Sequence, residues 1–134
     1  MSDERELIRE YQDAVRGIVS ALRRGFGRDD FLSATRRGEV PKEGSIGKVE
    51  FSFHGVGCRG TKDGVEVDFD FGPDGRTDGF DAWRVWDFAK KNAAKYPTFQ
   101  DCESVDEAMR RLERSGEIEC PHTAPSPHLW YWRS

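Results

Sequence analysis

The chain has few cysteines, few aliphatic side chains and no long apolar run. Of its 134 residues only 36% are hydrophobic, and three are cysteines, Cys58, Cys102 and Cys120. An odd number of widely spaced cysteines argues against a disulfide framework and for reduced thiols. No apolar run approaches the length of a membrane span, and the opening MSDERELIRE is charged where a secretory peptide would be apolar. We therefore expect a cytoplasmic protein without a membrane partner.

Basic residues are also fewer than acidic ones. The chain has 21 Lys and Arg against 25 Asp and Glu, a formal net charge of -4. Because phosphate contacts need a basic face, this balance disfavours a nucleic-acid partner and suits a basic protein partner. The length is that of one ordinary domain, and we predict a single domain over residues 1–134. Nine Phe, four Trp and three Tyr compensate for the scarce aliphatic side chains in a small core.

Apolar residues near the N-terminus recur at helical spacing and predict an amphipathic helix over residues 3–24. Gly25 and Gly27 are expected to end this helix, and residues 29–32 to start a short second helical turn. The predicted buried stripe of the first helix consists of Leu7, Tyr11, Val15, Ile18, Val19 and Leu22.

Two further helices are expected in the second half of the chain. After the turn-forming run GPDG at residues 72–75, Asp78 is well placed to cap a helix. Ser104 and Glu107 have the form of a capping box that opens another helix, and Gly116 would close it. The predicted inner stripe of the first of these two helices consists of Phe80, Trp83, Trp86, Ala89 and Ala93.

Alternation of apolar and polar residues predicts two antiparallel strands, near residues 48–54 and 65–71. The glycines between them suggest a bulged strand end and a turn at Asp63 and Gly64, with the register left open. Residues 129–132, LWYW, have the composition of a last strand that returns to the sheet. The expected fold is α+β: a small, mainly antiparallel sheet, with a hairpin at about residues 48–71 plus a C-terminal strand, packed against an N-terminal helix and two later helices.

Carboxylates gather on the second strand of this hairpin. Glu66, Asp68 and Asp70 are spaced by two residues and so should project from one face. They suit a partner-binding surface or a solvated strand face balanced by arginine and lysine. Since divalent cations prefer carboxylate oxygens, Asp68 and Asp70 with His54 are also compatible with a small metal-dependent enzyme. The spacing of a calcium loop is not met, and no metal ligand, catalytic residue or cofactor is assigned.

An exposed aromatic side chain beside acidic residues is typical of a protein interface, where the aromatic anchors and the charges steer. This pattern predicts a partner-binding surface over the hairpin and the C-terminal aromatics. A ligand-binding regulatory module, with residues 72–79 as its binding loop, is a further alternative. The predicted partner-binding residues are Glu50, Glu66, Asp68, Asp70, Asp74, Arg76, Trp130 and Trp132.

Cysteine and histidine offer two weaker alternatives. Cys58 and His54 would suit a nucleophile and its base, but residues four apart on an extended strand lie about 13 Å apart. We therefore expect Cys58 to be a small buried side chain. A zinc site built from this pair with Cys120 and His122, near His128, lacks the tight ligand pairs typical of zinc motifs.

Three segments, HGVGC, VDFDFGPDGRTDGFDAWRVW and YPTF, together resemble an uncharacterised bacterial family of small domains of unknown function. The resemblance covers about residues 45–99 strongly and the N-terminal helix more loosely, and it leaves out residues 120–134. It brings no catalytic residue. The resemblance implies a bacterial cytosolic protein of the kind that serves as an immunity partner to a toxin. The expected function is an intracellular protein-binding module, an immunity-type inhibitor that neutralises a bacterial toxin by occluding it.

Overall fold

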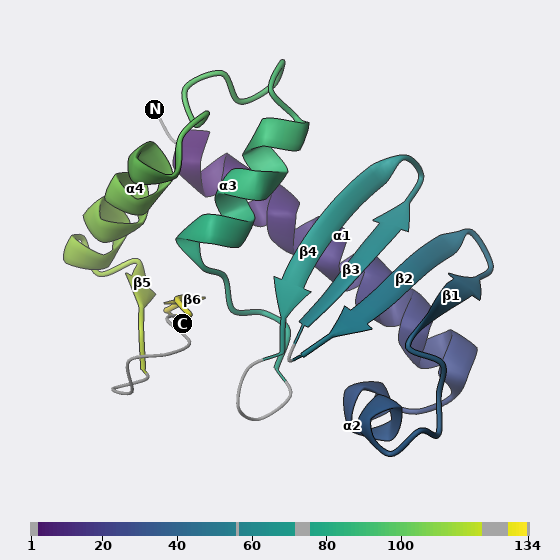
Figure 1. The fold of residues 1–134 in the computed structure, drawn as a ribbon. Helices are drawn as coiled ribbons and strands as arrows, with labels where there is room; N and C mark the ends of the chain where they lie inside the picture. The colour runs from purple at the N-terminus through teal and green to yellow at the C-terminus, as the bar shows by residue number, and fades with distance from the viewer. Residues whose placement is uncertain (1–2, 56, 72–75, 122–128, 134) are drawn as a thin grey trace. The chain divides into compact units, whose positions relative to one another are not determined.

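The computed structural model describes residues 3–55, 57–71, 76–121 and 129–133, and it confirms the expected α+β class (Figure 1). The chain divides into two compact units, residues 13–77 and residues 1–12 together with 78–134. Within the described ranges, no helix combines the length and the apolar character that crossing a membrane requires. The elements in chain order are α1 (Asp3–Phe26), α2 (Phe31–Arg36), β1 (Glu43–Ile46), β2 (Val49–His54), β3 (Gly57–Lys62), β4 (Val65–Asp70), α3 (Ala82–Lys91), α4 (Cys102–Arg114), β5 (Ile118–Glu119) and β6 (Tyr131–Trp132).

Helix α1 buries all six side chains of its predicted stripe. Acidic residues occupy its first turn and basic residues its last, as the helix dipole favours. The helix continues past Gly25, which was expected to end it, and stops at Gly27, whose φ is +66°. Gly25 serves packing instead: a Cβ there would lie 2.2 Å from Cγ2 of Ile46, on strand β1. Only glycine allows the helix and the strand to approach so closely.

The sheet of the unit formed by residues 13–77 has four antiparallel strands in the order β1-β2-β3-β4. The predicted turn at Asp63 and Gly64 is confirmed, with φ of 53° and 78°, as a tight hairpin requires. The region expected to be only a bulge forms a strand of its own, β3. Its Gly60 faces α1, where a Cβ would lie 2.6 Å from Cγ2 of Ile18. Strand β1 is an edge strand whose side chains are mostly exposed.

Aromatic rings fill much of the core of this unit. Phe26, at the end of α1, contacts Phe31 of α2 and the strand residues Phe51 and Phe53, with ring centroids 5.4–6.4 Å apart. Phe31 also meets Phe71 edge to face at 5.6 Å. The large rings therefore supply the apolar contact that the scarce aliphatic residues cannot.

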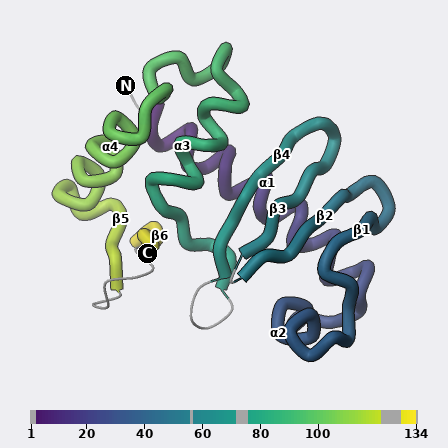
Figure 2. The backbone as a smooth tube through the Cα atoms, viewed as in Figure 1, coloured from purple at the N-terminus to yellow at the C-terminus, as the bar shows by residue number. Residues whose placement is uncertain are grey.

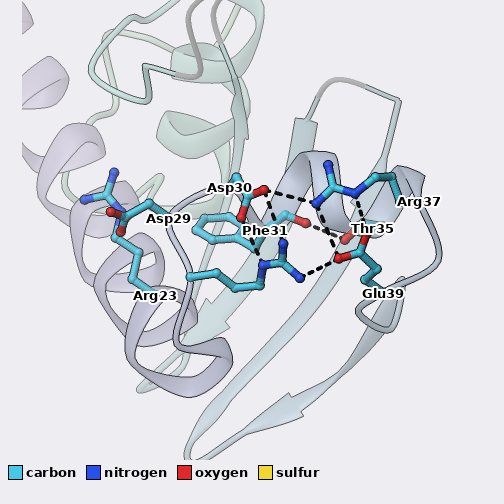
Figure 3. Close-up of polar contacts among 8 residues, drawn as sticks. Arg23, Asp29, Asp30, Phe31, Thr35, Arg37 and Glu39 are labelled. Carbon is cyan, nitrogen blue, oxygen red and sulfur yellow. Dashed lines mark hydrogen bonds and ion pairs between the residues drawn. The ribbon is translucent and has the colours of Figure 1, made fainter.

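A network of charged side chains surrounds α2 (Figure 3). Asp30 accepts hydrogen bonds from Arg28 and Arg37, and both arginines also bind Glu39. The Arg37 and Arg28 guanidinium groups lower the pKa of Glu39 to about 2. The helix itself lies at Phe31–Arg36, slightly beyond the predicted turn at residues 29–32. The network ties together the two ends of this short helix.

The second unit, residues 1–12 with 78–134, contains α3, α4 and a two-stranded sheet. Asp81 caps α3 by accepting a hydrogen bond from the Arg84 backbone N–H, and Asp101 caps α4 in the same way. The predicted caps, Asp78 and Ser104, are therefore wrong by three residues each. Helices α3 and α4 contact each other, and Tyr11 of α1 meets Phe88 of α3 edge to face.

The predicted C-terminal strand exists but pairs differently from expectation. Strand β6 runs antiparallel to β5, beside which Figure 2 traces it, and does not join the four-stranded sheet. Trp130 extends the pairing through an antiparallel bridge to Phe80. Glu117, next to β5, accepts two hydrogen bonds from the Arg5 guanidinium of α1. The aromatic strand thus pairs with β5 and Phe80 of its own unit, and not with the hairpin.

Candidate protein-binding face of the sheet

One face of the four-stranded sheet is polar throughout. Because successive side chains on a strand point to opposite faces, burial of Val49, Phe51 and Phe53 turns the alternate residues of β2 outward. The strand register then aligns the neighbouring strands' outward residues with them. We call the resulting surface the outer sheet face: Glu43 and Ser45 of β1, Glu50, Ser52 and His54 of β2, Arg59 and Thr61 of β3, and Glu66 and Asp68 of β4.

Arg59 lies at the centre of this face and binds two carboxylates. Its Nε is 3.3 Å from Oε1 of Glu66, and its Nη2 is 3.3 Å from Oδ2 of Asp68. His54 contributes a second contact to Asp68, with Nε2 at 3.4 Å from Oδ1. Because the Arg59 side chain is 55% exposed, each of its pairs is worth at most about 1 kcal/mol. The contacts therefore order the face more than they stabilise the fold.

The face carries a clear excess of negative charge. Glu43 and Glu50 are exposed, and neither forms an ion pair among the described residues. With Glu66 and Asp68 they outnumber Arg59, the fully charged cation of the face, because His54 is charged only when protonated. The outer sheet face is thus an acidic surface with one basic residue in its middle.

Asp70 does not belong to the exposed part of this surface, contrary to expectation. It follows Asp68 by two residues and lies opposite Gly57, but it is only 4% exposed. Strand alternation correctly predicted the face to which the Asp70 side chain points, but it cannot predict whether other residues cover that side chain. Of the other predicted residues in this region, Arg76 is exposed, and Asp74 lies outside the described residues.

The two predicted aromatic anchors serve the interior of the second unit. Trp130 is only 5% exposed, and its Nε1 is 3.3 Å from Oε2 of Glu113. Trp132 is half-buried: its Nε1 donates to Oε1 of Gln12 at 2.7 Å, and the Arg9 guanidinium lies 4.7 Å from the ring centroid. Trp130 is therefore corrected from an exposed anchor to a core residue: it pairs with the buried Phe80, and directly paired residues have their side chains on the same face.

Of the two tryptophans predicted to be buried on α3, one is the most exposed tryptophan of the chain. Trp83, predicted for the inner stripe of α3, is 61% exposed. The buried stripe of the helix is formed by Val85, Phe88 and Ala89, of which Ala89 was predicted. Phe80, also predicted, is buried just before the helix begins. The spacing of the three helix residues, by three and four positions, is also helical, so the signal was present in the sequence. It was missed because the larger tryptophans were taken to be the core.

Cys58 is a buried core residue, as expected. It is fully buried, and desolvation raises the pKa of its thiol to about 12. Cys58 pairs with Phe53 and His54 with Gly57, so the two side chains point to opposite faces of the sheet. This geometry does not suit a nucleophile and its base.

Metal-binding groups do not converge in the part of the chain that the structure describes. There, no three His, Cys, Asp or Glu side chains are placed to hold one ion. The His54 and Asp68 contact is the nearest approach to the metal-dependent site considered from the sequence. His122 and His128, considered for zinc, lie outside the described residues.

A comparison with protein families identifies the relationship. The family described as "Domain of unknown function (DUF6896)" matches residues 5–132. The chain belongs to this family. The DUF6896 match includes most of residues 120–134, which the motif resemblance had left out. Comparison of the DUF6896 chain with curated proteins gave no match, and comparison with solved structures gave none either.

Proposed function

We propose that the chain is a protein-binding module that docks a basic partner protein on its outer sheet face. The observation that carries the proposal is the excess of carboxylates over Arg59 on this single ordered surface. Complementary charge speeds encounter between partners and suppresses wrong ones. Glu43 and Glu50 offer exposed carboxylates, and Arg59 offers a planar donor group of the kind enriched at interface hot spots.

We further propose that this binding is inhibitory and that the chain is an immunity-type protein that occludes a bacterial toxin. Three features support the proposal: the net charge of -4, the acidic face, and the resemblance of the HGVGC and VDFDFGPDGRTDGFDAWRVW segments to small bacterial domains. Toxins that act on nucleic acids need basic surfaces to contact phosphates. An acidic sheet can cover such a surface directly, without any catalytic step of its own.

The test is affinity capture from the native cell lysate with the wild type and two charge-reversal variants. In the face variant, Glu43→Lys and Glu50→Lys act on the outer sheet face. In the matched control, Glu103→Lys and Glu107→Lys make the same charge change on α4, where both residues are exposed and form no ion pair among the described residues. We expect the wild type and the control to retain one stoichiometric basic partner. We expect the face variant to lose it by about tenfold or more.

Neutralisation is tested separately by expressing the captured partner alone and together with each variant. The proposal expects the partner to arrest growth by itself, and the wild type and the α4 control to restore growth. Capture that is equal for the face variant and the wild type would show that the outer sheet face is not the binding site. A captured partner that is harmless when expressed alone would contradict the immunity role but leave the binding role intact.

A further inference from the structure

Helix α3 presents an ordered aromatic surface to solvent. Trp83 meets Trp86 edge to face, with ring centroids 4.9 Å apart and an interplanar angle of 64°. The Nζ of Lys90 lies 3.9 Å from the ring centroid of Trp86. These three residues, spaced by three and four positions, occupy one stripe of the helix. We call them the tryptophan ladder.

The ladder is held in place without being buried. The Nε1 of Trp86 donates a hydrogen bond to the backbone oxygen of Gln100 at 3.1 Å, which fixes the orientation of that ring. The opposite side of α3 is occupied by its buried stripe, so the ladder cannot turn inward. Trp83 nevertheless remains 61% exposed. An exposed tryptophan is among the side chains most enriched as anchors of protein interfaces.

The charges around the ladder indicate what would cover it. Arg84 pairs with Asp81 at 2.7 Å, and Lys91 pairs with Asp87 at 2.8 Å. Lys90 differs from both, because it forms no ion pair with any residue that the structure describes. Next to the exposed Trp83 ring and the half-buried Trp86 ring there is therefore one ammonium group that a carboxylate would complement.

We propose that the tryptophan ladder binds an acidic segment of a partner protein. In this complex an apolar side chain of the segment covers the Trp83 ring, and a neighbouring carboxylate accepts a hydrogen bond from Lys90 Nζ. Nucleic acids and anionic membranes both need several cations acting together. Here two of the three nearby cations are already neutralised by Asp81 and Asp87. The ladder shares no residue with the outer sheet face, and the two surfaces suit partners of opposite charge.

The test is selection of phage-displayed random dodecapeptides on the folded chain. We expect the enriched peptides to combine Asp or Glu with an aromatic or aliphatic residue. A synthetic copy of the most enriched peptide should shift the indole N–H resonances of Trp83 and Trp86. Its affinity should fall about tenfold or more in Trp83→Ala, the loss typical of a central anchor. Lys90→Gln should weaken the binding of acidic peptides. It should leave unchanged the affinity of peptide copies in which Gln replaces Glu.

Matched controls separate this site from general effects. Val65→Ala removes the other large apolar side chain that is exposed among the described residues, and Lys48→Gln removes an exposed lysine on a strand connection. Both should leave the affinity unchanged. If Trp83→Ala lowers the melting temperature, Lys90→Gln still tests the site, because the Lys90 side chain is exposed.

Four results would overturn the proposal. The first is the absence of any enriched peptide, and the second is enrichment that is equal on the wild type and on Trp83→Ala. The third is enrichment of basic or uncharged peptides, which would remove the role of Lys90. The fourth is evidence that the tryptophan ladder binds a different ligand, either a second copy of the chain or a membrane. Indole shifts that depend on protein concentration alone would show a second copy of the chain, and Trp83-dependent binding to phosphatidylserine vesicles would show a membrane surface.

Discussion

Glu117 shows how one residue can join segments that are distant in sequence. Its carboxylate accepts hydrogen bonds from Nε and Nη2 of Arg5 at 2.5 and 2.6 Å. Arg5, assisted by the hydroxyl of Ser115, lowers the pKa of Glu117 from its ordinary value near 4.5 to about 2. The pair therefore links α1 to the start of β5, and its contribution to stability depends on pH.

The sign of this dependence follows from the lowered pKa. The stabilisation is fully present above about pH 4.5 and is lost as the pH falls through about 2. We expect Glu117→Gln to lower the melting temperature by a few degrees at pH 6 and to have almost no effect at pH 2. Thermal unfolding followed by circular dichroism measures both. Glu107→Gln, at an exposed site without an ion pair in the described chain, should change neither value; an equal effect of Glu117→Gln at both pH values would contradict the linkage.

Cys58 is expected to be inert in the folded protein. Burial raises its pKa to about 12, so almost no thiolate is present at pH 8. Cys102 and Cys120 are only half-buried. Iodoacetamide at pH 8, followed by peptide mass spectrometry, should label Cys58 at least tenfold more slowly than Cys120. All three should react alike in urea, and rapid labelling of Cys58 without urea would contradict its place in the core.

At the scale of elements, two residues at the start of α4 are candidates for its N-cap, and only one of them caps the helix. Asp101 Oδ1 accepts a hydrogen bond from the Ser104 backbone N–H at 2.7 Å, whereas Ser104 Oγ only donates to the Asp101 carbonyl. We expect Asp101→Ala to cost about 1 kcal/mol of unfolding free energy, and Asp101→Asn and Ser104→Ala much less. Urea unfolding measures the difference. A larger loss for Ser104→Ala would support the capping box predicted from the sequence.

Along the contact between α1 and β3, we expect two glycine substitutions to change the free energy of unfolding in opposite directions. A Cβ at Gly60 would lie 2.6 Å from Cγ2 of Ile18, so Gly60→Ala should destabilise by about 1–3 kcal/mol. A Cβ at Gly17 would meet only Lys62, at 3.7 Å, and alanine suits a helix better. Gly17→Ala should therefore stabilise by about 0.5–1 kcal/mol. Urea unfolding of both variants is the measurement; destabilisation by both would mean that the interface is tighter than the structure shows.

At the scale of the whole molecule, the net charge of -4 and the acidic face predict strong salt dependence of partner binding. Electrostatic steering acts mainly on the association rate and is screened within about 10 Å at 0.1 M salt. We expect the association rate of a basic partner to fall about tenfold between 50 and 500 mM salt, with a smaller change in dissociation. Surface plasmon resonance separates the two rates. A rate unaffected by salt would argue against docking on the acidic face.

Much of the secondary structure could be predicted because it depends on nearby residues. The stripe of α1 and the alternation of β2 and β4 come from side chains a few positions apart, and so does the turn at Asp63 and Gly64. Strand β3 was missed since glycines interrupt its apolar pattern. One of them, Gly60, must accommodate Ile18 of α1, a contact that local spacing does not reveal.

The candidate sites show the same division. Strand alternation predicted from sequence that Glu66 and Asp68 share one face, because that property belongs to the strand itself. The register that places Glu50 on the same face came from the structure. Sequence could not say that Asp70 is covered or that Trp130 is buried. These properties depend on what packs against each side chain. The sequence by itself therefore determined the periodic elements and their charge, while the tertiary structure alone decided which residues reach solvent, because burial is set by segments distant along the chain.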